Sequence, residues 1–199
     1  MTKYGRHSTD FRERARKLLN DGSYESLFYA ALEIRLGVEA RLKEYLAVQE
    51  HITKAKRDGW RVAHLGKSIE AAFKTGDKIA RFTVLHAETQ EQIGVLLYTP
   101  VTKRLQKLTQ RLGDYLHVSD SDMTTAWWTD FRDLLETAWA ELAEATRGQL
   151  LGVPLMNPRT KQVRMTVQFE KPEDTTAHAA ALEAAGSKVI IKVEYLEPN

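Results

Sequence analysis

Apolar residues recur every three or four positions over long stretches of this chain, a spacing that predicts amphipathic α-helices. One long stretch covers about 23–46 and begins at Ser23, a residue type whose hydroxyl accepts a backbone N–H at helix starts. Its apolar stripe consists of Leu27, Ala31, Ile34, Val38, Leu42 and Tyr45. Its polar faces carry Glu33, Arg35, Glu39, Arg41, Lys43 and Glu44. The pattern predicts a long helix with one side in a core and its charged sides in solvent.

Further helices are expected before and after this one, over about 11–19, 66–73, 100–116 and 123–147. Capping or proline residues mark three of their starts: Thr9 or Asp10 for 11–19, Thr99 followed by Pro100 for 100–116, and one of 119–122 for 123–147. The tryptophans of the last helix, Trp127, Trp128 and Trp139, follow its apolar stripe. We expect them in the core; stacking on nucleic-acid bases is the alternative. The fold class predicted is mainly α, a bundle of four to five helices.

Alternating apolar and polar residues predict a small β component. Residues 79–86 and 93–98 are rich in β-branched and aromatic types and predict two strands, a hairpin inserted in the bundle. The C-terminal part alternates at 163–169 and again at 189–195, with an alanine-rich, helix-favouring stretch at 172–185 between them. Two strands and one helix bury too little surface to be stable alone. We therefore expect this tail to pair with the strands at 79–98.

These patterns predict three regions. Residues 1–147 form a helical bundle carrying the hairpin insert, and 148–159, with two glycines and two prolines, form a linker. Residues 160–199 form a small β-α-β segment packed on the bundle.

Composition narrows the class of protein. The chain has 199 residues, 43% hydrophobic and 28% charged, as in ordinary globular domains. No apolar run approaches the roughly 20 residues that cross a bilayer, so no membrane partner is expected. The first residues lack the apolar core of a signal peptide, and there is no cysteine, so we expect a cytoplasmic protein without disulfides or thiolate metal sites. The net charge of +2 requires any nucleic-acid surface to be local.

The main candidate for chemistry is the end of the helix at 100–116, where Arg111, Asp114 and His117 lie close in sequence. A fixed cation beside an imidazole that exchanges protons near neutral pH suits phosphodiester chemistry without a metal. Two other arginine–histidine pairs have similar spacing, Arg57 with His64 and Arg81 with His86. His64 follows a basic, glycine-containing stretch that is expected to connect two helices, and His86 is expected in a strand. Only His117 is predicted at the junction of two long helices.

The segment 107–117, KLTQRLGDYLH, resembles the arginine-to-histidine motif of HEPN domains, small helical modules that include many RNA-cleaving toxins and defence proteins. The segment 23–39, SYESLFYAALEIRLGVE, is similar to the first bundle helix of many HEPN proteins. The resemblance covers about 23–147 and implies a HEPN-like bundle and a metal-independent endoribonuclease that leaves 2′,3′-cyclic phosphate ends. It implies proton transfer by His117, phosphate stabilisation by Arg111 and an orienting role for Asp114. Leucine follows Arg111 where asparagine is frequent, and Gly113 is unusual in the motif.

Helix geometry restricts how this motif can work. Six positions turn an α-helix through roughly 240°, so Arg111 and His117 do not share a face of one regular helix. Either the helix ends near Gly113, or the two residues meet partners on another chain. Because HEPN nucleases are often dimers with facing motifs, the resemblance implies a homodimer. Lys103, Arg104 and Lys107 precede the motif and are candidate RNA-binding residues.

Simpler interpretations remain beside this one. A histidine just after a helix end can simply interact with the helix dipole, and the lysine face can be an ordinary solvated surface. No spacing of histidines and carboxylates predicts a metal site, and no cofactor is expected. The alternative function is a non-catalytic HEPN-like binding or scaffold protein that acts through protein–protein contacts. In either case the resemblance implies a toxin–antitoxin or phage-defence context, with an antitoxin or defence-operon protein as a partner.

Overall fold

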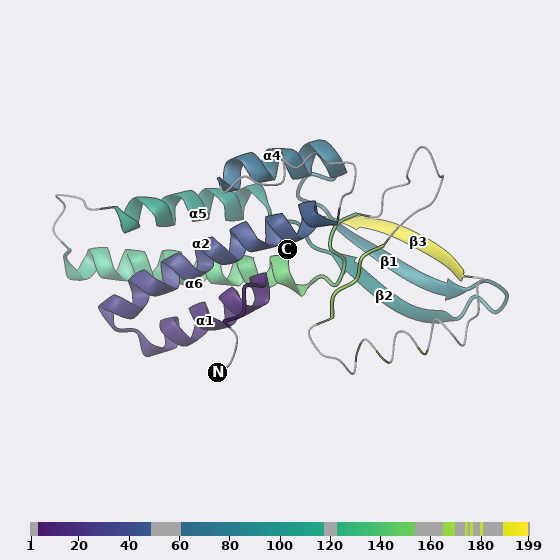
Figure 1. Ribbon diagram of the computed structural model, residues 1–199, viewed down its shortest axis with the longest axis horizontal. Helices are drawn as coiled ribbons and strands as arrows, with labels where there is room; N and C mark the ends of the chain where they lie inside the picture. The colour runs from purple at the N-terminus through teal and green to yellow at the C-terminus, as the bar shows by residue number, and fades with distance from the viewer. Residues whose placement is uncertain are drawn as a thin grey trace. The chain divides into compact units, whose positions relative to one another are not determined.

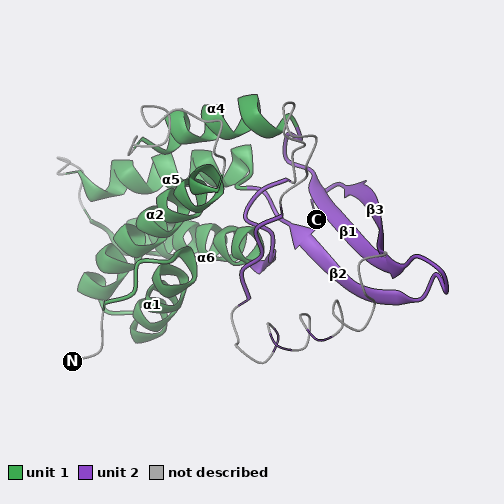
Figure 2. Ribbon diagram, turned by 45° about the vertical axis from the view of Figure 1, so that its right-hand side comes forward, with its two compact units in different colours: residues 1–74, 101–146 green, residues 75–100, 147–199 purple. Residues whose placement is uncertain are grey.

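The computed structural model describes residues 4–48, 61–117, 123–153, 165–169 and 189–198, with the single positions 174, 176 and 180. The chain divides into two compact units, each built from two separate stretches of sequence (Figure 2). Met1–Lys74 and Val101–Thr146 make a helical unit, and Thr75–Pro100 and Arg147–Asn199 make a unit that contains the sheet.

The helical unit confirms the mainly α prediction. Its helices are α1 (Ser8–Asp21), α2 (Tyr24–Ala47), α4 (Val62–Phe73), α5 (Lys103–Leu116) and α6 (Thr125–Arg147) (Figure 1). The long helix α2 has its predicted apolar stripe buried, from Leu27 to Tyr45. No helix in the described part of the chain is long and apolar enough to span a membrane.

Helix starts follow side-chain chemistry, although not always at the predicted residue. Ser23 caps α2 as predicted, because its hydroxyl oxygen accepts the N–H of Ser26 at 3.3 Å. For α1 the prediction was wrong by a few residues, since the cap is His7 and its N–H donates to the Asp10 carboxylate at 2.8 Å. Between the two helices, hydrogen bonds from the hydroxyls of Ser23 and Ser26 lower the pKa of Asp21.

The two later helices also start differently from expectation. Thr102, not Thr99 with Pro100, caps α5, and its side-chain oxygen accepts the N–H of Leu105 at 3.1 Å. Thr124 precedes α6 and accepts the N–H of Trp127 at 3.3 Å. The predicted caps at 119–122 lie outside the described residues.

The start of α6 lies in an aromatic cluster. Phe131 is fully buried and stacks on Tyr115 of α5 with ring centroids 4.7 Å apart. Trp127 and Trp128 pack around it but are only partly buried, so the prediction that the tryptophans lie in the core was too strong. Trp128 also stacks on exposed Tyr24 at 4.0 Å. Trp139 is likewise partly buried, and its indole N–H donates to the Arg12 carbonyl.

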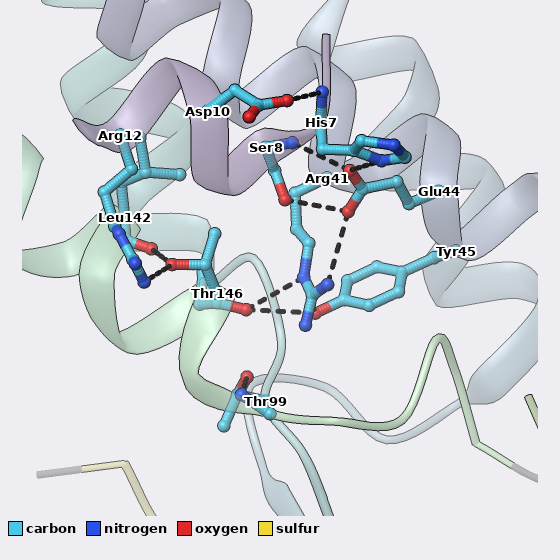
Figure 3. A network of polar contacts seen from close by, with 12 residues as sticks. His7, Ser8, Asp10, Arg12, Arg41, Glu44, Tyr45, Thr99, Leu142 and Thr146 are labelled. Carbon is cyan, nitrogen blue, oxygen red and sulfur yellow. Dashed lines mark hydrogen bonds and ion pairs between the residues drawn. The ribbon is translucent and has the colours of Figure 1, made fainter. Parts of the chain in front are cut away.

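A buried polar network joins the ends of three helices (Figure 3). The prediction that Arg41 lies on a solvent face was wrong, because its side chain is only 2% exposed. Its Nε donates to the Tyr45 hydroxyl at 2.9 Å and to the Ala145 carbonyl at 3.0 Å, and its Nη1 donates to Glu44 at 3.2 Å. Glu44 also accepts the backbone N–H and the hydroxyl of Ser8, each at 2.8 Å.

The charge of Arg41 is compensated inside this network. Burial alone lowers the pKa of Arg41, but the neighbouring Tyr45 and Glu44 raise it, and the net shift is upward. The guanidinium therefore stays protonated and ties α2 to the first residue of α1 and to the end of α6.

The sheet of the second unit has the order β2-β1-β3 and is antiparallel throughout. The strands β1 (Ile79–His86) and β2 (Gln92–Tyr98) form the predicted hairpin. The C-terminal strand β3 (Val189–Leu196) pairs with β1, which confirms that the tail completes a sheet with 79–98.

The residues after α6 are a packed segment, so the linker prediction was wrong for its first part. Gly148, Leu150 and Val153 are buried. The Leu150 N–H donates to the Leu97 carbonyl of β2 at 2.9 Å, and Leu150 forms an isolated bridge with Val167. Residues 154–159 of the predicted linker lie outside the described part.

The remaining tail predictions are only partly covered. Of the strand predicted at 163–169, residues 165–169 are described, with Val167 in its bridge. In the predicted helix at 172–185, Asp174, Thr176 and Ala180 are helical, and the other positions lie outside the described residues.

Gly148→Ala should destabilise the sheet unit by about 1–3 kcal/mol, the usual cost of overpacking. An added Cβ would lie 2.6 Å from Thr99 Oγ1 and 2.7 Å from the Leu97 carbonyl, and the backbone carbonyl cannot rotate away. Chemical denaturation measures the loss, with Asp133→Ala, an exposed position in α6, as the control. Equal stability of the two variants would contradict this account of the packing.

Candidate nucleic-acid site at the end of helix α5

Helix α5 presents the predicted cationic face to solvent. Leu105, Leu108 and Leu112 are buried on its inner side. On the outer side, five predicted site residues are exposed, namely Lys103, Arg104, Lys107, Arg111 and Asp114. The four-residue spacing of Lys103, Lys107 and Arg111 gives a row of positive charge along about two turns.

His117 lies where α5 stops, as predicted. It is the C-cap residue, exposed, with an extended backbone (φ −86°, ψ 145°). The helix continues through Gly113 to Leu116, so the option that it ends near Gly113 was wrong. Over this uninterrupted helix the six steps leave a net turn of about 240°, so Arg111 and His117 are about 120° apart around the axis and about 9 Å apart along it. The structure therefore does not bring Arg111 and His117 together within one chain.

Gly113 has a neighbour that the sequence did not reveal. A Cβ built at Gly113 would lie 3.4 Å from Nη1 of Arg35, so the guanidinium of this α2 residue lies against the backbone of α5. Gly113 and His117 are four residues apart and share a side of the helix. Arg35 is thus a cation on the His117 side of α5, whereas Arg111 lies on the other side. The unusual glycine in the motif was the one sequence signal for this close approach.

Most of these polar side chains are not committed to partners inside the protein. Among the described residues, Arg35, Lys107, Arg111, Asp114 and His117 form no hydrogen bond or ion pair through their side chains. Arg104 differs, because its Nη1 lies 3.2 Å from Glu141 of α6. Arg104 is therefore a weaker candidate for RNA binding than Lys107 or Arg111.

The two competing arginine–histidine pairs have other surroundings. His86 ends β1, and its Nδ1 accepts the N–H groups of Glu88 and Thr89 at 3.3 and 3.2 Å, which fixes the turn to β2. Arg81 pairs with Glu194 across the sheet at 3.8 Å. His64 lies within α4, which begins at Val62 rather than at Gly66 as predicted. Arg57 lies outside the described residues.

The arrangement around α5 suits an extended polyanion. Positive side chains in a row contact successive phosphates, and the exposed imidazole of His117, at the end of the helix but on another side of it, is accessible to a ribose. No group of three or more histidines and carboxylates in the described part of the chain is arranged to hold a metal ion.

Comparison with known proteins adds no neighbour. Neither protein-family models, nor curated proteins, nor solved structures gave a match to this chain. The HEPN resemblance therefore stays a prediction from the segments 23–39 and 107–117.

Proposed function

We propose that this protein is a metal-independent endoribonuclease of the HEPN type, acting as a toxin or phage-defence effector. The observation that supports it is the uncommitted, exposed set of Lys107, Arg111, Asp114 and His117 along one helix and its end. Buried or paired side chains would instead favour a purely structural role for this segment.

In this proposal the 2′-hydroxyl of RNA attacks the adjacent phosphorus, and the 5′-oxygen leaves, giving a 2′,3′-cyclic phosphate. His117 transfers the protons, since imidazole exchanges protons near neutral pH. Arg111 stabilises the phosphorane through its planar fork of donors, and Asp114 orients its neighbours. Lys103 and Lys107 guide the backbone of the RNA. Arg35 adds a second guanidinium on the His117 side of α5.

The proposal requires a second copy of the chain. Because α5 is continuous to Leu116, Arg111 and His117 of one chain are on different sides of the helix. A symmetric dimer with the segment 111–117 at its contact places Arg111 of one copy near His117 of the other. Two-fold symmetry then creates two equivalent sites.

The wild-type protein should cleave RNA in EDTA and leave 2′,3′-cyclic phosphate ends. End-labelled RNAs of several sequences, separated on gels and treated with a phosphatase that opens cyclic ends, identify the product. His117→Ala, purified in parallel, detects any contaminating nuclease, because the contaminant would cut in both preparations. Equal cutting by both, or no cutting of any RNA by the wild type, would reject the proposal.

A second candidate is a non-catalytic binding or scaffold protein, which could serve the same defence or toxin–antitoxin setting. It is favoured by the exposed apolar side chains of β3, among them Val193 and Tyr195. A wild-type protein that cuts no RNA but captures a partner encoded beside it would support this candidate.

A further inference from the structure

Among the described strands, β3 lies at an edge of the sheet and has exposed apolar side chains. In the order β2-β1-β3 one side of β3 pairs with β1, and no described strand lies along the other side. Ile191, Val193 and Tyr195 are 41%, 45% and 55% exposed. An unpaired edge carrying such side chains is a template for pairing with another strand.

These three side chains continue a face that is otherwise buried. In register, Tyr195 is opposite Ala80, Val193 opposite Phe82 and Ile191 opposite Val84. All three β1 residues are buried, and directly opposed residues of antiparallel strands point to the same side of a sheet. The apolar face therefore extends to β3, the last described strand on that side of the sheet.

The opposite side of β3 carries one positive and one negative charge. Lys192 and Glu194 are two positions apart and point to the same side of the sheet. Glu194 already lies 3.8 Å from Arg81 of β1. Opposite charges placed two residues apart on a strand are the pattern that an antiparallel copy of the same strand matches.

We propose that β3 pairs with β3 of a second copy of this chain, antiparallel, with the two-fold axis at Val193. Val193 then faces Val193 of the other copy, Ile191 faces its Tyr195, and Ile190 faces its Leu196. Lys192 faces Glu194 in both directions, so each Glu194 lies between Arg81 of its own chain and Lys192 of the other. The result is one continuous sheet of six strands from two chains, without an exposed β3 edge.

The register follows from the charges. An axis at Lys192 or at Glu194 would set like charges directly opposite each other, which destabilises strand pairs. An axis at Ile191 would place Lys192 opposite Ile190, and an axis at Tyr195 would place Glu194 opposite Leu196. Within β3 only the axis at Val193 opposes both charged residues with the opposite charge. This self-complementarity is the reason to choose a second copy over an unrelated strand.

Charge reversal tests the pairing. Lys192→Glu leaves two negative charges on each strand, and Glu194→Lys leaves two positive charges, so each variant repels its own copies. A mixture of the two variants restores complementarity, because every negative side chain of one variant strand then faces a positive side chain of the other. Lys67→Glu, at an exposed position of α4, is the control for the same change of net charge.

The absence of cysteine from the chain allows a readout that is specific to this joint. Val193→Cys places one thiol of each copy beside the two-fold axis, so mild oxidation should link two chains through a disulfide. The link should be lost when Lys192→Glu or Glu194→Lys is added to Val193→Cys, and should return when these two double variants are mixed. Lys67→Cys, at the exposed α4 position, reports random collisions and should link far more slowly.

If the charge variants failed to link because they were misfolded, mixing them would not restore the link, so recovery on mixing excludes a folding defect. The circular dichroism spectrum of each variant should also match that of the wild type. Val193→Cys that links no faster than Lys67→Cys, or charge variants that link as fast as Val193→Cys alone, would overturn the inference. The result is independent of RNA cleavage and of any contact at 111–117, because the disulfide forms only where two β3 strands meet.

Discussion

Arg41→Ala should lower the free energy of unfolding by about 3–5 kcal/mol, the range found when one partner of a buried ion pair is removed. Arg41 is 2% exposed and Glu44 13% exposed, so the carboxylate would lose its cation where little water replaces it. The Ala145 carbonyl would also lose the Arg41 donor. Urea titration followed by far-UV circular dichroism measures the change in midpoint.

Two controls separate the ion pair from simple truncation. Lys43→Ala removes a cation paired with Glu39 on the surface of the same helix, and should cost about 0–1 kcal/mol. Arg41→Met combined with Glu44→Gln removes both charges while keeping side-chain volume, and should cost less than Arg41→Ala alone. Equal free energies of unfolding for Lys43→Ala and Arg41→Ala would contradict the view that the buried network stabilises the helix ends.

His117→Ala should reduce the RNA cleavage rate by about 10²–10⁴, the usual effect of losing one well-placed general acid or base. The fold should not change, because His117 is exposed and lies after the last turn of α5. Arg111→Lys should also fail, since a point charge does not reproduce the bidentate fork. Asp114→Asn should have a milder effect if it only orients its neighbours. Single-turnover cleavage of labelled RNA in EDTA measures each variant.

Mixing variants tests whether the site is shared between chains. In a dimer of His117→Ala with Arg111→Ala, one of the two composite sites keeps both residues, and the other has neither. Cleavage should therefore return on mixing two inactive proteins. If the mixture stays inactive while Arg35→Lys alone abolishes cleavage, the phosphate contact belongs to Arg35 and no shared site is needed.

Periodicity predicted most helices and the three paired strands because burial on one side of an element imposes a regular spacing of apolar residues. Periodicity gave wrong predictions for residues whose surroundings are set by contacts with parts of the chain that are distant in sequence. In the sequence, Arg41 is surrounded by other charged residues and is expected to face solvent. It is buried because α1 and α6 pack against this part of α2: Ser8 of α1 binds Glu44, and the Ala145 carbonyl of α6 accepts a hydrogen bond from Arg41. Gly148 was interpreted as part of a linker, but glycine is needed at this position because its backbone lies against β2 and leaves no room for a Cβ.

The candidate site was predicted from a motif and from the spacing of its charges, and the structure shows that its side chains are exposed, whereas their catalytic and binding roles stay predictions. Their mutual geometry was only partly predictable, because the end of α5 at Leu116 rather than near Gly113 depends on packing. Arg35 was missed as a neighbour, since it is far from the motif in sequence and only the packing of α2 against α5 brings it there.

The central strand of the sheet has a consequence for biosynthesis. Phe82 of β1 pairs with Val193 of β3, more than a hundred positions later in the chain. Such a pairing has a high entropic cost of loop closure and therefore forms late. During translation the hairpin of β1 and β2 emerges early and must keep its apolar edge unpaired until β3 leaves the ribosome. A chain interrupted before residue 189 would permanently expose β1, so truncated products of this protein should be prone to aggregate and depend on chaperones.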